Sequence, residues 1–308
     1  MRLPGRIVAA AGPVFLLAGA LCAQEKPAPA VGGQYQAKSH PPEVKTITRV
    51  TSPAKSTESA PQPMGYESNL YCFGYIGPAD EQFPFTTIGA ENLVEQSVFI
   101  TGDLMYLNGG LDRGLKEGEE FWLVTQEQDI VHPTTNKSLG RYYHFRGRAS
   151  VLSVQDRTAT VSITAACGDI SLGVALKPFE PIPIPLAHKM PAAAAGDPPS
   201  GKATGHIVHS KDGLVAIGSD SAVMVDLGAV HGIQPGDFLT IFRYAQEREY
   251  GIRPFGVAWE LKAPPVGMEI PRTYLGEVAV LMVGDRWAIC RVTDSYRLIE
   301  IGDQVELK

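Results

Sequence analysis

Several features are scarce or missing in this sequence of 308 residues, and each excludes a class of protein. No window carries a long apolar repeat with the helical period of 3.6 residues, so helices should be scarce. Lysine and arginine form no cluster and the formal net charge is −6, which argues against a nucleic-acid-binding protein, because such proteins present a basic face. The apolar run at residues 7–21 is short and interrupted by glycine and proline, so we expect no transmembrane segment in the mature chain.

Motifs for catalysis and cofactor binding are also missing. There is no Gly-x-Ser-x-Gly elbow, and residues 232–237 resemble a phosphate-binding loop only superficially, because the Lys-Ser/Thr ending is absent. His206 and His209 could supply two metal ligands, but alternation along a strand should send their side chains to opposite faces. We therefore expect no enzymatic activity, no catalytic residue, no metal site and no cofactor.

Residues 1–23 have the layout of a secretory signal peptide, in which two arginines precede an apolar run and then small residues. Cys22 leaves a lipoprotein anchor as an alternative, although Leu21 stands where such signals carry a small side chain. We favour a protein that is periplasmic or secreted without this anchor.

Two further segments are rich in proline and small or polar residues. Residues 24–68 contain almost no large apolar side chain and cannot offset the entropy of ordering, so we expect a disordered tether. Residues 179–203 are rich in proline and alanine, and the alternating prolines favour polyproline II, so we expect two modules joined by a semi-extended linker rather than fused. The modules themselves would span residues 69–178 and 204–308.

What the sequence does contain is a duplication. Residues 147–159 match residues 276–288 without a gap, and the glycines and apolar residues around Gly110 match those around Gly228. Two matching blocks in the same order mean two copies of one architecture.

Each copy reads as a series of short strands with glycine at the corners. Residues 278–283 and 287–292 flank a Gly-Asp-Arg turn and predict a β-hairpin, and residues 149–163 have the same shape. About five to seven short strands per copy favour a small barrel that closes its own edges. The expected fold is all-β, with two tandem β-barrel modules of the same topology.

The repeated pattern is an apolar strand, Gly-x-x-x-Gly-[Leu/Ile]-x-x-Gly-[Asp/Glu], an apolar strand, a hairpin and a closing strand. This pattern, over residues 74–177 and 205–308, resembles the C-terminal β-domain of the flagellar assembly protein T family. It is also similar to modules of bacterial envelope proteins that sometimes accompany LysM domains. The resemblance implies a role in envelope assembly or surface binding, and it brings no catalytic residues with it.

The cysteines predict one disulfide. Cys290 falls on a core position of the repeat and should be a buried thiol. If residues 74–76 are aligned with residues 205–207, Cys72 and Cys167 both lack a counterpart in the second copy. In an oxidising compartment, this favours a Cys72–Cys167 disulfide.

Aromatic residues outside the repeat are the candidates for contact with a partner or glycan. One group lies in residues 244–272, a long excursion that only the second copy carries, and the other precedes the first hairpin. The alternative is that these rings pack over a barrel end, inside the barrel or between the modules. The candidate contact residues are Tyr250, Phe255, Trp259, Tyr142 and Tyr143.

These observations predict an exported, non-enzymatic envelope protein that acts as a structural or protein-interaction module. Its partner would be an envelope protein or a cell-wall glycan. A peptidoglycan-binding or polysaccharide-binding module is the alternative, and an envelope hydrolase with an unfamiliar site is a third. The sequence leaves open the partner's identity, the envelope system and the oligomeric state.

Overall fold

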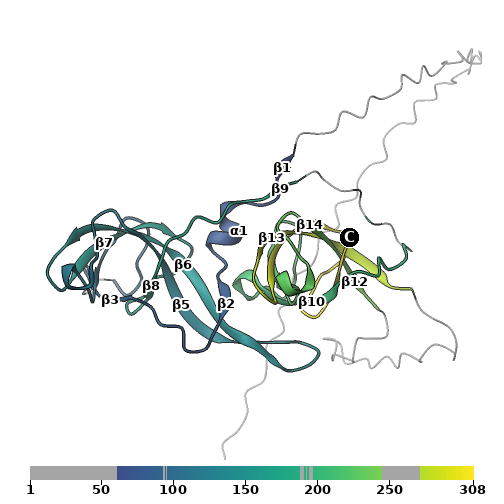
Figure 1. Cartoon of the computed structure of the whole chain (residues 1–308), viewed down its shortest axis with the longest axis horizontal. Coiled ribbons are helices and arrows are strands. Elements are labelled where there is room, and N and C mark those ends of the chain that lie inside the picture. The colour runs from purple at the N-terminus through teal and green to yellow at the C-terminus, as the bar shows by residue number, and fades with distance from the viewer. Residues whose placement is uncertain are drawn as a thin grey trace, which may run out of the picture. The chain divides into compact units, whose positions relative to one another are not determined.

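The structure is a computed structural model that describes residues 61–92, 94, 96–187, 191, 193, 197–244 and 271–308. All of these residues belong to one compact unit, Thr57–Lys308. Strands dominate this part of the chain, which contains one short α-helix, α1 (Glu67–Tyr71), and three 3-10 turns, η1 (Leu111–Arg113), η2 (Lys211–Gly213) and η3 (Ala229–His231). The protein is therefore all-β, as predicted (Figure 1). None of the helices described here is long and apolar enough to span a membrane.

The first barrel is a closed ring of six strands within residues 85–178. In chain order the strands are β3 (Phe85–Ala90), β4 (Leu104–Leu107), β5 (Glu120–Val131), β6 (Ser138–Val154), β7 (Ala159–Ala166) and β8 (Ala175–Pro178). They pair antiparallel in the order β3-β4-β7-β6-β5-β8, and β8 pairs with β3 to complete the ring. Closure leaves no free edge around the barrel itself.

The second barrel repeats this arrangement. Its strands are β10 (Thr204–Ser210), β11 (Ala222–Val225), β12 (Phe238–Arg243), β13 (Thr273–Val283), β14 (Ala288–Ser295) and β15 (Gln304–Leu307). The ring order is β10-β11-β14-β13-β12-β15, which is the same permutation of sequential strands as in the first barrel. The prediction of two β-barrels with one topology is confirmed.

The sequence repeat reflects equivalent positions in the two barrel cores. Val151 pairs with Val161 across β6 and β7, and Val280 pairs with Cys290 across β13 and β14. Each pair belongs to the apolar core of its own barrel. Alternation along a strand turns these side chains inward, so the same apolar spacing fills both interiors.

A repeated glycine is required where a 3-10 turn docks on the tip of each hairpin. Leu111 N donates to Gln155 O over 2.9 Å, and Ala229 N donates to Gly284 O over the same distance. A Cβ atom on Gly228 would lie 2.6 Å from the carbonyl oxygens of residues 284 and 285, and one on Gly110 would collide with Gln155 O. Both copies therefore keep glycine at this contact.

The alignment of residues 74–76 with residues 205–207 is wrong. β2 (Tyr75–Gly77) lies outside the ring and pairs with β6, whereas the counterpart of β10 is β3. A three-residue strand carries too little apolar pattern to distinguish these two roles.

Parts of the expected tether and linker form structure. β1 (Gln62–Pro63) pairs antiparallel with β9 (Leu186–Ala187), and α1 starts at Glu67, before the expected module boundary. Met64 N also donates to Pro185 O over 2.9 Å. The short pairing between two proline-containing segments left no periodic signal in the sequence. The predicted signal peptide and the tether up to residue 60 lie outside the described residues.

The predicted disulfide is present. Cys72 and Cys167 are bonded with their Cα atoms 5.3 Å apart. The bond ties the segment after α1 to the residue that follows β7. Cys290 is a free, buried thiol in the core of the second barrel, as expected.

Candidate binding site at the junction of the two modules

The two modules share one continuous apolar cluster, which we call the junction cluster. The first module and the segment before it contribute Met64, Leu70, Phe73, Ile130 and Tyr142, and the second contributes Val208, Ala222, Met224, Phe238, Ala279, Leu281 and Ile289. All of these side chains are less than a tenth exposed. The outward faces of strands in the second module are therefore partly apolar, and they pack in one cluster with side chains of the first module.

Tyr142 and Tyr143 are interior side chains. Tyr142 is 3% exposed, and its hydroxyl donates to Phe73 O in the junction cluster. Tyr143 is fully buried, stacks on Tyr75 with centroids 5.2 Å apart and donates to Pro78 O over 2.6 Å. These rings therefore hold the N-terminal segment and the junction, and neither presents a face to solvent. The other three aromatic candidates, Tyr250, Phe255 and Trp259, lie outside the described residues.

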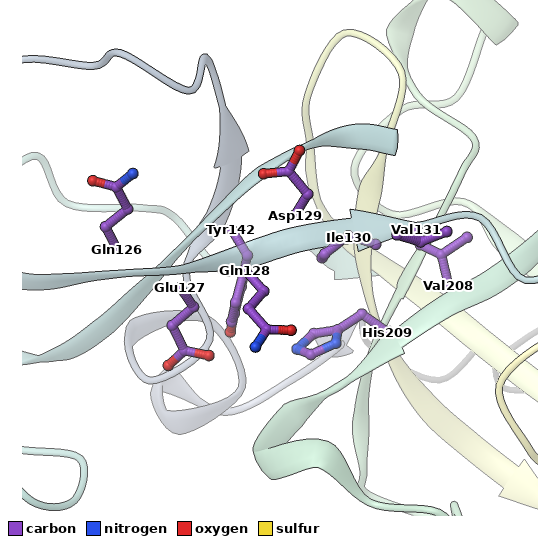
Figure 2. A pocket seen from close by; sticks show the side chains of 9 residues that line it. All are labelled: Gln126, Glu127, Gln128, Asp129, Ile130, Val131, Tyr142, Val208 and His209. Carbon is purple, nitrogen blue, oxygen red and sulfur yellow. The ribbon is translucent and has the colours of Figure 1, made fainter. Parts of the chain in front are cut away.

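A polar hollow lies beside the junction cluster, and we call it the junction hollow. It has a volume of about 590 Å³, within the range of small-ligand sites. Figure 2 shows the side chains of Gln128 on β5 and His209 on β10 reaching toward each other across it. The complete lining is Gln126, Glu127, Gln128, Asp129, Ile130, Val131, Tyr142, Val208 and His209.

Both carboxylates of the junction hollow are held by residues of β6. Glu127 Oε1 lies 2.8 Å from Arg146 Nη2 and 3.0 Å from His144 Nδ1. Asp129 accepts from Arg141 Nε over 2.6 Å, and these two residues are paired directly across the strands. The hydrogen bonds from Arg141 and then Ser138 hold the pKa of Asp129 below its ordinary value. The two acids are therefore fixed in orientation and compensated in charge.

His209 enters the junction because of a β-bulge. The register of β10 against β11 shifts between Ile207 and His209, so an extra residue interrupts the alternation of side chains. As a result, His206 lies 5.0 Å from the His132 ring and His209 lies 4.6 Å from the Tyr142 ring, centroid to centroid. The prediction that His206 and His209 face opposite sides is wrong, since both contact the first module. Burial lowers the pKa of His209, which keeps the ring neutral at neutral pH.

A second polar group, the His132–Asp226–His206 link, connects the modules. Asp226 Oδ2 lies 2.9 Å from His132 Nε2 and 3.7 Å from His206 Nδ1, while Asp226 Oδ1 accepts from His206 N over 2.5 Å. Burial alone would raise the pKa of Asp226, but its contacts with His206 and then His132 outweigh burial and lower it. His132 was not among the predicted site residues, because it sits in a polar turn that carries no signal for a partner 94 residues away.

The link has the composition of a metal site, since its three ligand atoms lie within 4.8 Å of one another. The surroundings of His132 argue against one. Its Nδ1 accepts from Thr134 N over 3.1 Å and from Thr135 N over 3.2 Å, so a neutral ring carries its proton on Nε2. A metal on Nε2 would force that proton onto Nδ1, against two N–H donors. The His132–Asp226 contact therefore fits a hydrogen bond between the modules better than a metal centre, whereas His206 Nδ1, 3.7 Å from Asp226, makes no hydrogen bond to the described residues.

The described residues offer no activated thiol. Cys290 is the free cysteine among them, and burial raises the pKa of its thiol far above the ordinary value. A protonated thiol inside an apolar core is a poor nucleophile.

The chain was also compared with known proteins. No protein-family profile and no curated protein matches it. The resemblance to the flagellar assembly protein T family remains a prediction from the motif, and function has to be argued from the junction itself.

Proposed function

We propose that this chain is an exported, non-enzymatic protein of the bacterial envelope that acts as a structural or protein-interaction module. The observation that carries the proposal is the junction cluster, which joins two closed barrels through buried side chains from both. A protein of this kind can present surfaces of both modules to an envelope partner.

Export is supported by the Cys72–Cys167 disulfide, because structural disulfides persist in oxidising compartments and are rare in a reducing cytosol. The signal-peptide pattern of residues 1–23 points to the same destination, the periplasm or the exterior.

The non-enzymatic assignment is supported by how the junction histidines are used. His132 and His206 contact Asp226, and His144 contacts Glu127. His132 and His144 therefore have hydrogen-bond partners that explain their positions without a reaction, and the described thiol is buried.

The test is fractionation of cells that produce the full chain, with thiol labelling before and after reduction. We expect the protein in the periplasm or medium, with Cys72 and Cys167 labelled only after reduction. Site-specific cross-linking from exposed barrel residues should then yield a discrete product with an envelope protein. Recovery from the cytosol with both thiols free, or hydrolysis of peptidoglycan by the pure protein, would contradict the proposal.

Binding of peptidoglycan or another polysaccharide is the second candidate function, and the junction hollow is the observation that favours it. Cosedimentation of the purified protein with peptidoglycan sacculi tests it directly. Retention that saturates with protein concentration supports binding, whereas recovery of all protein in the supernatant argues against it. Tyr250, Phe255 and Trp259 remain predicted contacts for either partner.

A further inference from the structure

We infer that the junction hollow binds an uncharged segment of a saccharide. The inference rests on the second candidate function and specifies where the glycan binds and what charge it carries. It follows from three properties of the hollow, which are its charge balance, its fixed acceptors and its apolar margin.

The charge balance of the hollow selects against ionic ligands. The carboxylates of Glu127 and Asp129 are each paired with a guanidinium, from Arg146 and Arg141 respectively. His209 adds no charge at neutral pH, because burial lowers its pKa. An anionic ligand would meet two carboxylates in the lining, and a cationic ligand would have to compete with arginines already in place.

The same ion pairs prepare hydrogen-bond acceptors for hydroxyl groups. A carboxylate has about four lone-pair sites, so Asp129 can accept further bonds while Arg141 and Ser138 hold it. Gln126 and Gln128 are exposed and also line the hollow. Gln126 Nε2 donates to Ala79 O over 3.5 Å, and each amide still offers a donor and an acceptor. Acceptors that are already oriented lower the entropic cost of binding a ligand with many hydroxyl groups.

The margin of the hollow supplies apolar contact without an open aromatic face. Val131 is 50% exposed and lines the hollow together with Ile130 and Val208. Aliphatic side chains of this kind can cover the C–H face of a sugar ring. Because the Tyr142 ring is buried, recognition depends on hydrogen bonds more than on stacking, so we expect weak affinity for a short oligosaccharide.

The experiment is a titration of the isotope-labelled mature protein, with its disulfide intact, followed by amide NMR. The neutral probes are tri-N-acetylchitotriose and maltotriose, and the charged probes are the de-acetylated glucosamine trimer and trigalacturonate. We expect saturable shifts at residues 126–129 and at His209 with at least one neutral trimer, and about tenfold weaker binding of the charged trimers.

Variants locate the binding. Gln128→Ala should weaken binding of the neutral trimer about fivefold, as expected for loss of one uncharged hydrogen bond, and adding Gln126→Ala should weaken it further. Gln234→Ala is the matched control, since this amide is also exposed but lies outside the hollow. All three positions are exposed, so melting temperatures should stay close to that of the unmodified protein.

The inference is overturned if neither neutral trimer gives saturable shifts, or if the shifts lie outside the hollow. It is also overturned if the charged trimers bind as tightly as the neutral ones, or if the variant with both Gln126→Ala and Gln128→Ala binds the neutral trimer with unchanged affinity. Sacculus cosedimentation separates this failure from that of the function. If sacculi retain the protein and its double variant equally, cell-wall binding occurs at another site. Sacculi that retain neither would remove the second candidate function as well.

Discussion

The most informative perturbation of the junction is Asp226→Asn. Asp226 receives two donors on two different oxygens, His206 N at Oδ1 and His132 Nε2 at Oδ2. An asparagine has the same shape but only one oxygen, so one donor must face an NH2 group. The substitution therefore breaks one hydrogen bond to a charged group and leaves a buried donor without an acceptor.

The magnitude follows from this geometry. His132 is 8% exposed, so its lost bond is not replaced readily by water. Losing a hydrogen bond to a charged partner at such a site costs about 2 kcal/mol of the free energy of unfolding. For a unit of this size, that lowers the melting temperature by about 4–8 °C at neutral pH.

The effect should depend on pH in a defined direction. The pKa of Asp226 is lower in the folded protein than in the unfolded chain, so its stabilisation is complete above the unfolded value, about 3.9, and is lost as pH falls through the folded value. Asparagine does not titrate, so the difference in melting temperature between the two proteins should shrink from pH 7 to about pH 3.

Thermal unfolding of both proteins at the two pH values, followed by circular dichroism, measures this. Asp285→Asn at the exposed tip of a hairpin is the control and should leave the melting temperature unchanged. Equal melting temperatures of the Asp226 variant and the unmodified protein at pH 7 would refute the reasoning. A difference in melting temperature between the two proteins that stays the same at about pH 3 would also refute it.

Three further predictions test the barrels, the disulfide and the loop. Replacing both cysteines of the disulfide with alanine should lower the free energy of unfolding by about 2–5 kcal/mol in denaturant titrations, and an unchanged value would mean that the bond constrains nothing. Gly228→Ala should destabilise the second barrel by more than about 2 kcal/mol, because its Cβ would meet carbonyl oxygens at 2.6 Å, whereas Gly218→Ala has open space and should be tolerated. If residues 244–272 bind, replacing Phe255 and Trp259 with alanine should abolish capture of partner or sacculi at an unchanged melting temperature; a melting temperature lowered by several degrees with capture intact would place these rings in the core.

Those features of the fold that depend on a local, repeated pattern could be predicted from the sequence. The spacing of apolar residues and glycines within one copy predicts the hairpins, the glycine at the 3-10 turn and the core position of Cys290. The same spacing in the second copy supports each of these predictions. The disulfide was also predicted correctly, although the alignment used for Cys72 was wrong. What carried that prediction was the absence of any matching cysteine in the second copy.

The candidate site could not be predicted in the same way, because its parts meet only when the modules pack. His132 and Asp226 are 94 residues apart, each just after the end of a strand, and the local sequence around one gives no sign of the other. The bulge that turns His209 toward Tyr142 breaks the alternation on which sequence reasoning depends.

The sequence by itself determined the class of fold, the duplication and the cores, since apolar alternation and glycine corners are local consequences of barrel geometry. Only the tertiary structure decided which outward faces are covered. An apolar residue on the outside of a strand, such as Val208, has the same local pattern whether it meets water or a second module. Its burial, and the polar hollow beside it, depend on the packing of one barrel against the other.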